Sequence, residues 1–289
     1  MKIPEKKLKC GFGMPALGLG TWQMGGREER DVKDDGSESE RALREGLALG
    51  YTLIDTAEMY AGGFAEEIVG RAIEGSPREK LFLTSKVWKT HLHYDDVLRS
   101  LEDSLKRLKT DYLDLYLIHQ VEPSVPLSET MRALNRLVDE KLIRHIGVSN
   151  FNRERLEGAQ VFADSKVVVD QVHYNLRIRE TEESGLLKYC QENDIMITAW
   201  RPLQKGMLLE SREQILAPLS EKYGVPVSAI ALAWLLSQEN ITTITMSRNP
   251  DHLAENMAAA NLQLTEDEVE MLRREFPEQE KISNAVPLI

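Results

Sequence analysis

The sequence predicts an α/β fold, a closed (β/α)8 barrel (a TIM barrel) in which each parallel strand is followed by a helix. Short apolar runs rich in Val, Ile and Leu alternate eight times with longer segments of helical character, and this alternation is typical of a parallel sheet. The runs are mostly apolar, as expected for strands buried on both faces. Eight such units within 289 residues favour a closed barrel over an open sheet. No composition shift marks a linker, so a single domain over residues 1–289 is expected.

The N-terminal part is expected to form a β-hairpin that leads into the first barrel strand. The segment from Leu8 to Trp22 contains the turn sequence Gly11-Phe12-Gly13 and an apolar run after it. A helix is expected over 37–49, with Ser37 as its N-cap and Gly50 at its end.

The rest of the chain supplies seven further strands and their helices. The strands are expected near 52–54, 81–86, 113–118, 143–148, 167–172, 195–200 and 241–246. The helices are expected near 64–74, 95–108, 128–140, 152–162, 182–193, 211–223, 226–238, 250–259 and 265–275, so that extra helices lie near the C-terminus. The tail over 276–289 is expected to fold over the barrel mouth or to pack elsewhere.

Composition excludes several classes of function. The net charge is −11 and no basic patch of the kind that nucleic acids need is present. No apolar run approaches the length that spans a membrane, and the N-terminus has no apolar signal core. The two cysteines, Cys10 and Cys190, offer neither a disulfide framework nor the spacing of a metal site. We therefore expect a cytoplasmic protein without a metal, a nucleic-acid partner or a membrane anchor.

Four polar residues stand where predicted strands end. Asp55 follows the apolar run of the second strand, and Tyr60 comes five residues later on a loop. Lys86 ends the third strand, and His119 follows the fourth. Because reacting groups of parallel α/β barrels gather at the C-terminal ends of the strands, we expect these four side chains to converge.

These residue types can together deliver a proton. A free phenol has a pKa of about 10, which is too high for an efficient acid at neutral pH. We predict that Lys86, held by Asp55, lowers the pKa of Tyr60, and that Tyr60 then protonates a carbonyl oxygen. A neutral His119 would orient that oxygen. The alternative is a salt bridge on the barrel rim beside a surface Tyr and a capping His, and the arrangement at successive strand tips argues against it.

Short motifs in one order extend this pattern along nearly the whole chain. They are Leu17 to Trp22, the Asp-Thr-Ala-x-x-Tyr segment from Asp55 to Tyr60, Ser85 to Trp88, Leu117 to His119, Gly147 to Phe151, and Ala254 to Asn256. In this order they closely resemble the aldo-keto reductase family, particularly its prokaryotic and archaeal members. The resemblance implies reversible reduction of aldehydes and ketones by hydride transfer, with NAD(H) or NADP(H) as cofactor and no metal.

The resemblance also implies a set of cofactor-binding residues. Ser149, Asn150 and Gln171 match the positions that bind the nicotinamide carboxamide; Ser149 and Asn150 could cap the next helix, either instead of this role or together with it. Trp200 matches an aromatic residue that stacks on the nicotinamide ring; the alternative is a core aromatic that ends its strand. The complete implied set is Thr21, Trp22, Asp55, Ser149, Asn150, Gln171, Trp200, Arg201, Leu203, Gly206, Met246, Ser247, Arg248, His252, Glu255 and Asn256.

The expected adenosine end departs from the family pattern. Met246 and His252 stand where the family usually has the Lys and Arg that hold the 2′-phosphate of NADP. Arg248 could restore part of that charge by swinging onto the phosphate. Arg201, where a small hydroxyl residue is common, pairs with phosphate oxygens or points to solvent. We therefore expect good use of NAD(H), with some use of NADP(H).

The substrate pocket is expected to have aromatic walls. Trp22 and Trp88 match positions at the family's active-site mouth, beside Tyr60 and His119; the alternative is a pair of rim aromatics. The partner would be a small carbonyl or alcohol substrate, and the protein a monomer or weak homodimer. Two other functions stay open: a cofactor-binding regulatory subunit with little turnover, and a barrel enzyme without a redox cofactor.

Overall fold

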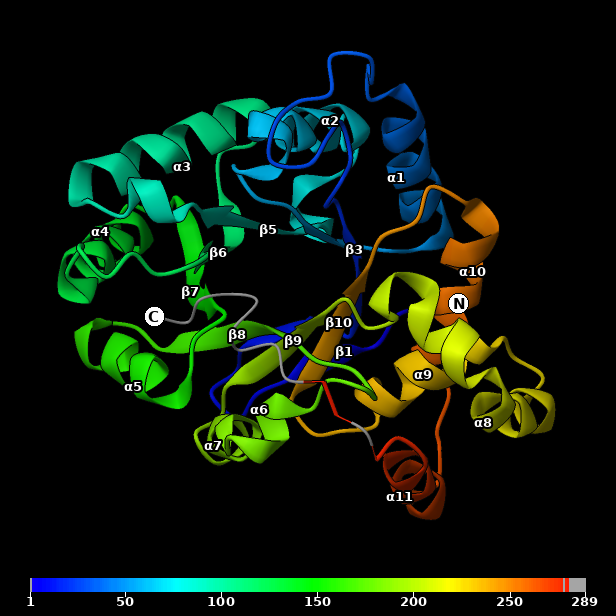
Figure 1. Ribbon diagram of the computed structural model, residues 1–289. Coiled ribbons are helices and arrows are strands. Elements are labelled where there is room, and N and C mark those ends of the chain that lie inside the picture. The colour runs from blue at the N-terminus through cyan, green and yellow to red at the C-terminus, as the bar shows by residue number, and fades with distance from the viewer. Residues whose placement is uncertain (1, 278, 281–289) are drawn as a thin grey trace.

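Eight parallel strands close into a barrel in the computed structural model, which describes residues 2–277, 279 and 280, with the backbone alone at 205 and 207–213 (Figure 1). The last strand in sequence pairs with the first strand of the barrel, which follows the N-terminal hairpin, and this pairing closes the barrel. This confirms the predicted fold class. In barrel order the strands are β3 (Leu17–Gly20), β4 (Leu53–Asp55), β5 (Phe82–Val87), β6 (Leu113–Ile118), β7 (Ile143–Ser149), β8 (Val167–His173), β9 (Met196–Trp200) and β10 (Ile241–Thr245).

Helices surround the barrel, and an antiparallel hairpin of β1 (Glu5–Lys7) and β2 (Gly13–Pro15) precedes it. Phe12, in the hairpin turn, packs edge-on against Phe82 and His145, with ring centroids 6.2 Å and 4.8 Å away. Because Phe82 begins β5, the hairpin covers the N-terminal end of the barrel. The helices are α1 (Ser37–Leu49), α2 (Phe64–Ala72), α3 (Tyr94–Leu108), α4 (Leu127–Asp139), α5 (Arg153–Phe162), α6 (Glu180–Glu183), α7 (Leu186–Glu192), α8 (Met207–Tyr223), α9 (Val227–Leu236), α10 (Pro250–Ala259) and α11 (Glu266–Glu275).

Three local predictions were wrong. Ser37 is not the N-cap of α1: Gly36 is, with φ 79°, and the Asp35 carboxylate accepts the Ser37 N–H. The helix expected over 182–193 is split into α6 and α7 at Gly185, whose φ of 77° a helix does not allow. The helix α8 begins at Met207, earlier than expected, directly after Gly206 with φ 90°. The tail over 281–289 lies outside the described residues, so its expected position is not addressed.

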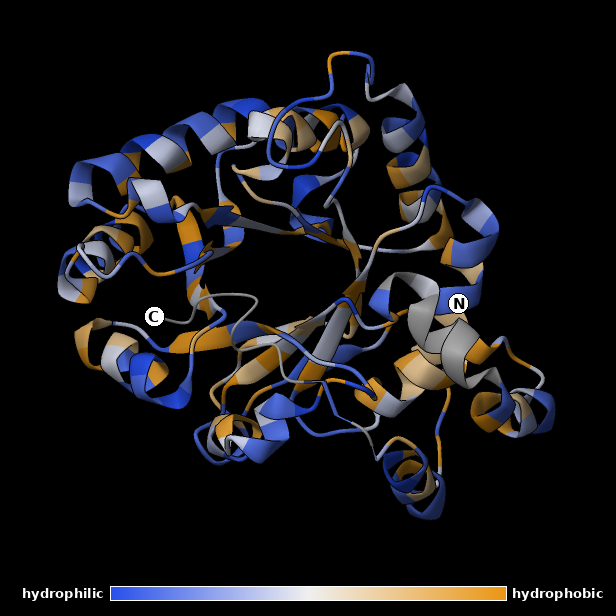
Figure 2. Cartoon of the chain, in the orientation of Figure 1, coloured by the Kyte–Doolittle hydropathy of each residue, from blue (hydrophilic) through white to orange (hydrophobic). Residues whose placement is uncertain are grey.

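Apolar side chains fill the interior of the barrel and the layer between strands and helices. Figure 2 marks hydrophobic residues in orange along the strands and on the surrounding helices. Leu53, Leu115 and Val169 are fully buried inside the barrel. Each contributes roughly 1.5–3 kcal/mol through its burial. A Cβ at Gly18 would lie 2.4 Å from Leu53 Cγ, so only glycine fits against this packing.

The two-residue period of a strand carries polar groups from this interior to one end of the barrel. Leu53 and Asp55 lie on the same face of β4, because side chains two residues apart point the same way. Leu117 and His119 are related in the same way along β6. The interior of the barrel is therefore packed with apolar side chains, and titratable groups lie at the C-terminal ends of its strands.

Candidate active site

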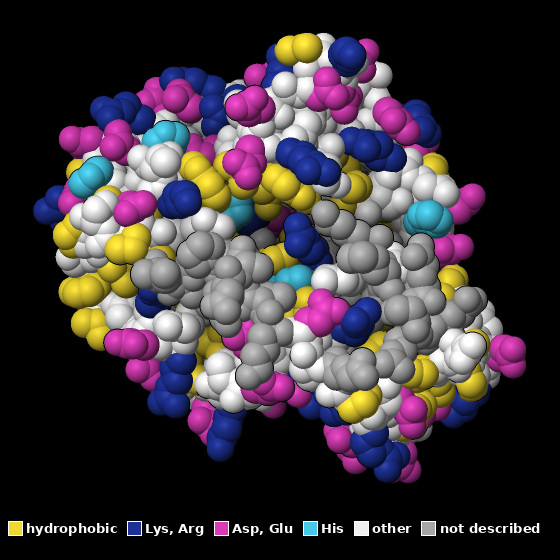
Figure 3. Space-filling view, in the orientation of Figure 1, with side chains coloured by type: hydrophobic (Ala, Val, Ile, Leu, Met, Phe, Trp, Pro, Cys, Tyr) yellow, Lys and Arg dark blue, Asp and Glu magenta, His cyan; other side chains and the backbone are white. Residues whose placement is uncertain are grey.

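A cavity of about 780 Å³ opens at the C-terminal ends of the strands. Figure 3 shows the molecule hollowed near the centre of this face. The lining includes Asp55, Tyr60 and His119, together with residues from the ends of β7 to β10. This volume is within the range of cofactor and substrate sites.

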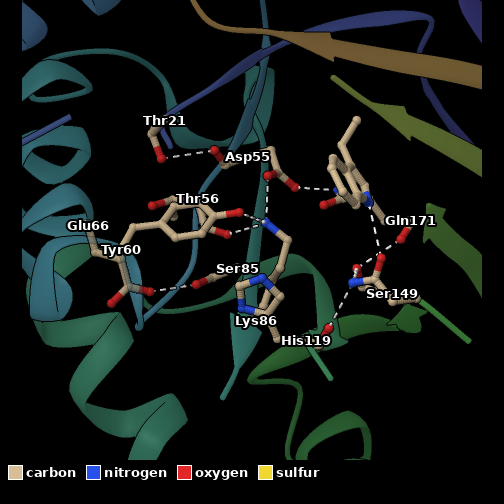
Figure 4. A network of polar contacts seen from close by, with 12 residues as sticks. Thr21, Asp55, Thr56, Tyr60, Glu66, Ser85, Lys86, His119, Ser149 and Gln171 are labelled. Carbon is tan, nitrogen blue, oxygen red and sulfur yellow. Dashed lines mark hydrogen bonds and ion pairs between the residues drawn. The ribbon is translucent and has the colours of Figure 1, made fainter. Parts of the chain in front are cut away.

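The ammonium group of Lys86 is the centre of the site (Figure 4). Its Nζ atom donates to Asp55 Oδ1 at 2.6 Å, to the carbonyl oxygen of Thr56 at 2.7 Å and to the phenolic oxygen of Tyr60 at 3.4 Å. Asp55 uses its other oxygen to accept from Gln171 Nε2 at 2.7 Å. Lys86 has no exposed surface, and its three donors thus have three acceptors.

The pKa values of this group differ in part from the prediction. Burial alone would lower the pKa of Lys86, but the charges of Asp55 and Tyr60 raise it above its usual value. Burial raises the pKa of Tyr60, and the opposing effect of Lys86 is smaller. The prediction that Lys86 and Asp55 lower the pKa of Tyr60 was therefore wrong. The rise in the pKa caused by burial of the phenol is larger than the fall caused by the charge of Lys86.

His119 lies beside Tyr60, with ring centroids 5.6 Å apart, and also contacts Trp88 at 4.9 Å. Its backbone N–H donates to the Val87 carbonyl oxygen at 3.0 Å, which holds it at the tip of β6. Burial, then the charge of Lys86, lowers its pKa well below 6.5, so the imidazole is neutral at pH 7. Its Nδ1 atom is buried and has no hydrogen-bond partner among the described residues. Because Nδ1 is out of reach, Nε2 is the ring nitrogen that a ligand would contact.

Tyr60 is positioned by an unusual turn. Tyr60–Gly63 form a short 3-10 segment in which Ala61 has φ 52° and Gly63 has φ 92°. The Ala61 N–H donates to the Arg27 carbonyl oxygen at 2.6 Å, so the loop after β3 supports the turn. A Cβ at Gly63 would lie 2.8 Å from Arg107 Nε, which requires glycine there.

Polar side chains from β7, β8 and β9 form the opposite wall. Asn150, with φ 61°, donates from Nδ2 to Ser149 Oγ at 3.0 Å and accepts at Oδ1 from Trp200 Nε1 at 3.2 Å. Ser149 Oγ donates to the Gln171 carbonyl oxygen at 2.8 Å. The alternative that Ser149 or Asn150 caps the next helix is wrong, because Asn152 is the N-cap of α5.

Comparison with known proteins decides the family. The family model described as "Aldo/keto reductase family" matches residues 16–274. The chain belongs to the aldo/keto reductase family. Aldo/keto reductases transfer hydride between nicotinamide cofactors and carbonyl compounds, so this chain is an NAD(P)H-dependent oxidoreductase. A barrel enzyme without a redox cofactor is excluded, and a regulatory subunit is not favoured.

Two curated relatives are similar over most of their length. The uncharacterised oxidoreductase YtbE of Bacillus subtilis is 38% identical over 91% of this chain and 89% of its own. Methylglyoxal reductase YeaE of Escherichia coli is 35% identical over 91% of this chain and 92% of its own. Both alignments cover 91% of this chain.

Two solved structures have the same fold. The thermostable aldo-keto reductase Tm1743, in complex with the inhibitor epalrestat, superposes with a TM-score of 0.90 at 45% identity, covering 94% of this chain and 99% of that one. An aldo/keto reductase from Klebsiella pneumoniae, in complex with NADP and acetate, has a TM-score of 0.84 at 36% identity, covering 97% and 98%.

At the far end of the reductase cavity, Met246, Ser247 and His252 line the wall. Met246 is 39% exposed, which is unusual for a large apolar side chain. Arg248 is not among the described lining residues: it donates to the Gln23 carbonyl oxygen at 2.7 Å and to Ser39 Oγ at 3.0 Å. Swinging onto a phosphate would break both bonds.

The remaining sequence-predicted residues are found along the same cavity. Thr21 Oγ1 donates to the Asp55 carbonyl oxygen at 3.1 Å, and Asn256 Nδ2 donates to Thr245 Oγ1 at 3.4 Å. Trp22 packs edge-on against Tyr60 at 5.0 Å. The cavity is further lined by Trp88, Arg201, Leu203, Gly206 and Glu255.

Sequence reasoning missed two residues that orient the site. His173 stacks on Trp200 with centroids 4.2 Å apart and rings within 20° of parallel, and its Nε2 bonds Gln204 Oε1 at 2.9 Å. It lies two residues after Gln171 on β8, and that spacing could have revealed it. Glu58 accepts from the backbone N–H of Trp88 and contacts His91 Nδ1 at 3.1 Å. Glu58 lies within the motif that contains Asp55, so the sequence could have placed it near the site. Its contacts with Trp88 and His91 could not be predicted from the sequence.

Two absences concern only the part of the chain that the structure describes. There, no group of three or more His, Cys, Asp or Glu side chains is arranged to hold a metal ion. None of the helices described has the length and apolar character needed to cross a membrane.

Proposed function

We propose that Tyr60 is the general acid of a carbonyl reduction, with Lys86 and Asp55 as its supporting pair and His119 as the group that orients the carbonyl oxygen. The observation that carries the proposal is the buried Lys86 ammonium, which bonds Asp55 Oδ1 at 2.6 Å and the Tyr60 oxygen at 3.4 Å. A phenol and a charged amine buried together at a cavity wall suit proton transfer far better than packing.

The raised pKa of Tyr60 means that the phenol holds its proton in the resting site, while the charge of Lys86 is needed to make that proton transferable. An acid must carry its proton before the reaction, and burial keeps Tyr60 protonated at neutral pH. As the carbonyl oxygen gains negative charge, Tyr60 donates its proton to that oxygen. The charge of Lys86 then stabilises the phenolate that is left, while Asp55 balances Lys86 before and after the transfer.

The residues opposite Tyr60 fit a nicotinamide cofactor. Its carboxamide needs both donors and acceptors, and Asn150, Ser149 and Gln171 supply them within one wall. Trp200 offers an indole face against which a planar ring can stack. When bound, the cofactor supplies the hydride that the protein's own side chains cannot.

We also propose that NADH is used well, in preference to NADPH. The described residues that line the far end of the cavity include the carboxylate of Glu255 but neither Lys nor Arg. The nearest candidate, Arg248, is held by two hydrogen bonds elsewhere. Each missing charge-assisted hydrogen bond to a 2′-phosphate costs about 1.5–3 kcal/mol.

Small aldehydes and 2-oxo-aldehydes are the proposed substrates. Relatives of this chain are named methylglyoxal reductase and glyoxal reductase. Trp22 and Trp88 narrow the mouth beside Tyr60, which favours small or flat carbonyl compounds. A screen of such aldehydes, in which the loss of absorbance of the reduced nicotinamide measures turnover, tests the proposal. If none of them oxidised either reduced cofactor, the proposed substrate class would be rejected.

The reductase is proposed to act in the cytoplasm as a monomer or weak homodimer. Asp55, Tyr60, Lys86 and His119 all come from one chain, so the site needs no partner subunit. Both cysteines are unpaired, which suits a reducing compartment. Sedimentation at several protein concentrations measures the oligomeric state, and a stable tetramer would contradict the proposal.

A further inference from the structure

Arg201 introduces a positive charge at the mouth of the cavity. It follows Trp200 at the end of β9, and its guanidinium carbon lies over the Trp200 ring, 5.2 Å from the ring centroid. The residue is exposed to solvent and lines the same cavity as Tyr60. Burial raises the pKa of Tyr60, and the charges of Lys86 and, to a smaller extent, Arg201 oppose this rise.

This cation has no anionic partner of its own. Among the residues that the structure describes, the Arg201 side chain has neither an ion pair nor a hydrogen bond, and it is the one Lys or Arg in the cavity lining. The chain carries an excess of 11 negative charges, yet no carboxylate of the described residues forms an ion pair with this guanidinium. An uncompensated cation at the edge of a cavity is a ready site for an oxyanion.

The backbone holds Arg201 in this place. Its φ is 51°, in the left-handed region that a residue with a side chain seldom adopts. The Arg201 carbonyl oxygen accepts from Asn175 Nδ2 at 3.0 Å and from the Gln204 N–H at 3.1 Å. These bonds come from the loop after β8 and from the following turn, so tertiary contacts fix the direction of the residue.

We propose that Arg201 determines specificity by binding the carboxylate of carbonyl substrates that carry one. The inference rests on the proposed role of Tyr60, since the carboxylate would reach Arg201 while the carbonyl oxygen contacts the phenol. A planar guanidinium bonds a carboxylate through two parallel N–H groups, which aligns the substrate as well as holding it. Stacking on Trp200 limits the loss of side-chain freedom on binding.

The diphosphate of the cofactor is the other source of oxyanions for this cation. If Arg201 bound the diphosphate, replacing Arg201 would affect the turnover of every substrate equally. If Arg201 bound a substrate carboxylate, replacing it would affect only the substrates that carry a carboxylate. Because Arg201 and Tyr60 line the same cavity, we assign this cation to the substrate. The two sources are therefore separable by kinetics.

The test compares matched substrates with Arg201→Gln and Arg201→Lys. The pairs are para-formylbenzoate with its methyl ester, and succinate semialdehyde with its methyl ester, so that each pair differs chiefly in charge. In Arg201→Gln we expect the ratio of kcat/KM for acid over ester to fall about ten- to a hundredfold, as for a lost charge-assisted bond. Arg201→Lys should recover part of the ratio, because it keeps the charge but loses the two-pronged geometry.

A matched control separates local binding from long-range attraction. Lys89 is another cation near the mouth, 5.5 Å from the Trp88 ring centroid but outside the described cavity lining. Lys89→Gln removes the same charge, and we expect the acid-to-ester ratio to change less than twofold. An equal fall in Lys89→Gln would show general electrostatics and overturn the proposal.

The remaining outcomes are also decisive. An acid-to-ester ratio unchanged in Arg201→Gln would overturn the proposal, and a rise in the cofactor Kd alongside would assign Arg201 to the diphosphate. Cofactor Kd is measured by fluorescence titration, and circular dichroism checks the fold. If the wild-type protein reduced neither acids nor esters, the proposed function would fail, which differs from an active enzyme with an unchanged ratio.

Discussion

The ammonium nitrogen of Lys86 lies 3.4 Å from the phenolic oxygen of Tyr60, and both side chains are buried. One residue comes from the interior of β5 and the other from the turn after β4. This distance allows the amine to respond to the charge state of the phenol. The reaction proposed for the site depends on that response.

Tyr60→Phe is expected to lower kcat by about 10²–10⁴-fold, because general acid catalysis contributes that much. The ring and its contacts with Trp22 and His119 remain, so the cofactor Kd should change little. Steady-state turnover and fluorescence titration measure the two quantities. Tyr112→Phe is the control, since its ring lies between Arg78 and Arg144, outside the cavity lining described. Full activity of Tyr60→Phe on several aldehydes would disprove the assignment.

Lys86→Met is expected to lose turnover and also to destabilise the fold by about 3–5 kcal/mol, because Asp55 is left as a buried charge without its partner. The double variant Lys86→Met with Asp55→Asn removes that charge. It should regain most of the stability but none of the activity. Chemical unfolding and turnover assays separate the two effects. Recovery of activity in the double variant would show that the pair serves the fold alone.

His173 is expected to make the fold less stable in acid. Burial lowers the pKa of His173 to about 4, whereas an unfolded His has a pKa near 6.5. Below pH 6.5 the unfolded chain gains a proton that the folded chain does not, so stability falls as the pH drops toward 4. By pH 4 this loss amounts to about 3 kcal/mol.

The variant His173→Phe keeps a ring against Trp200 but cannot titrate. Its free energy of unfolding should therefore fall less than that of the wild type between neutral pH and pH 4. Identical curves for His173→Phe and wild type would refute the effect.

Cofactor choice should respond to charge at the far end of the cavity. The double variant Met246→Lys with His252→Arg supplies two cations where the lining now has an exposed thioether and an imidazole. We expect NADPH to bind at least about tenfold more tightly, with little change for NADH, because only NADPH carries the extra phosphate. Fluorescence titration with both cofactors measures this. A wild-type enzyme that already bound NADPH much more tightly than NADH would contradict the expectation.

The sequence by itself determined the barrel and the positions of Asp55, Lys86 and His119 at the ends of its strands. The reason is that strand period and apolar runs are local properties, and a parallel barrel brings the ends of all strands to one face. Tyr60 could be placed on the loop after the second strand, because it comes only five residues after Asp55. The cofactor wall required the additional resemblance to a family.

Only the tertiary structure decided how these groups behave. The pKa of Tyr60 rises because burial by several elements outweighs Lys86, and that sum cannot be evaluated along one segment. Arg248 is held by Gln23 and Ser39, far from it in sequence, and Arg201 is turned by a bond from Asn175. A residue's type sets the chemistry it can perform, but neighbours distant in sequence set its charge, its direction and its freedom to move.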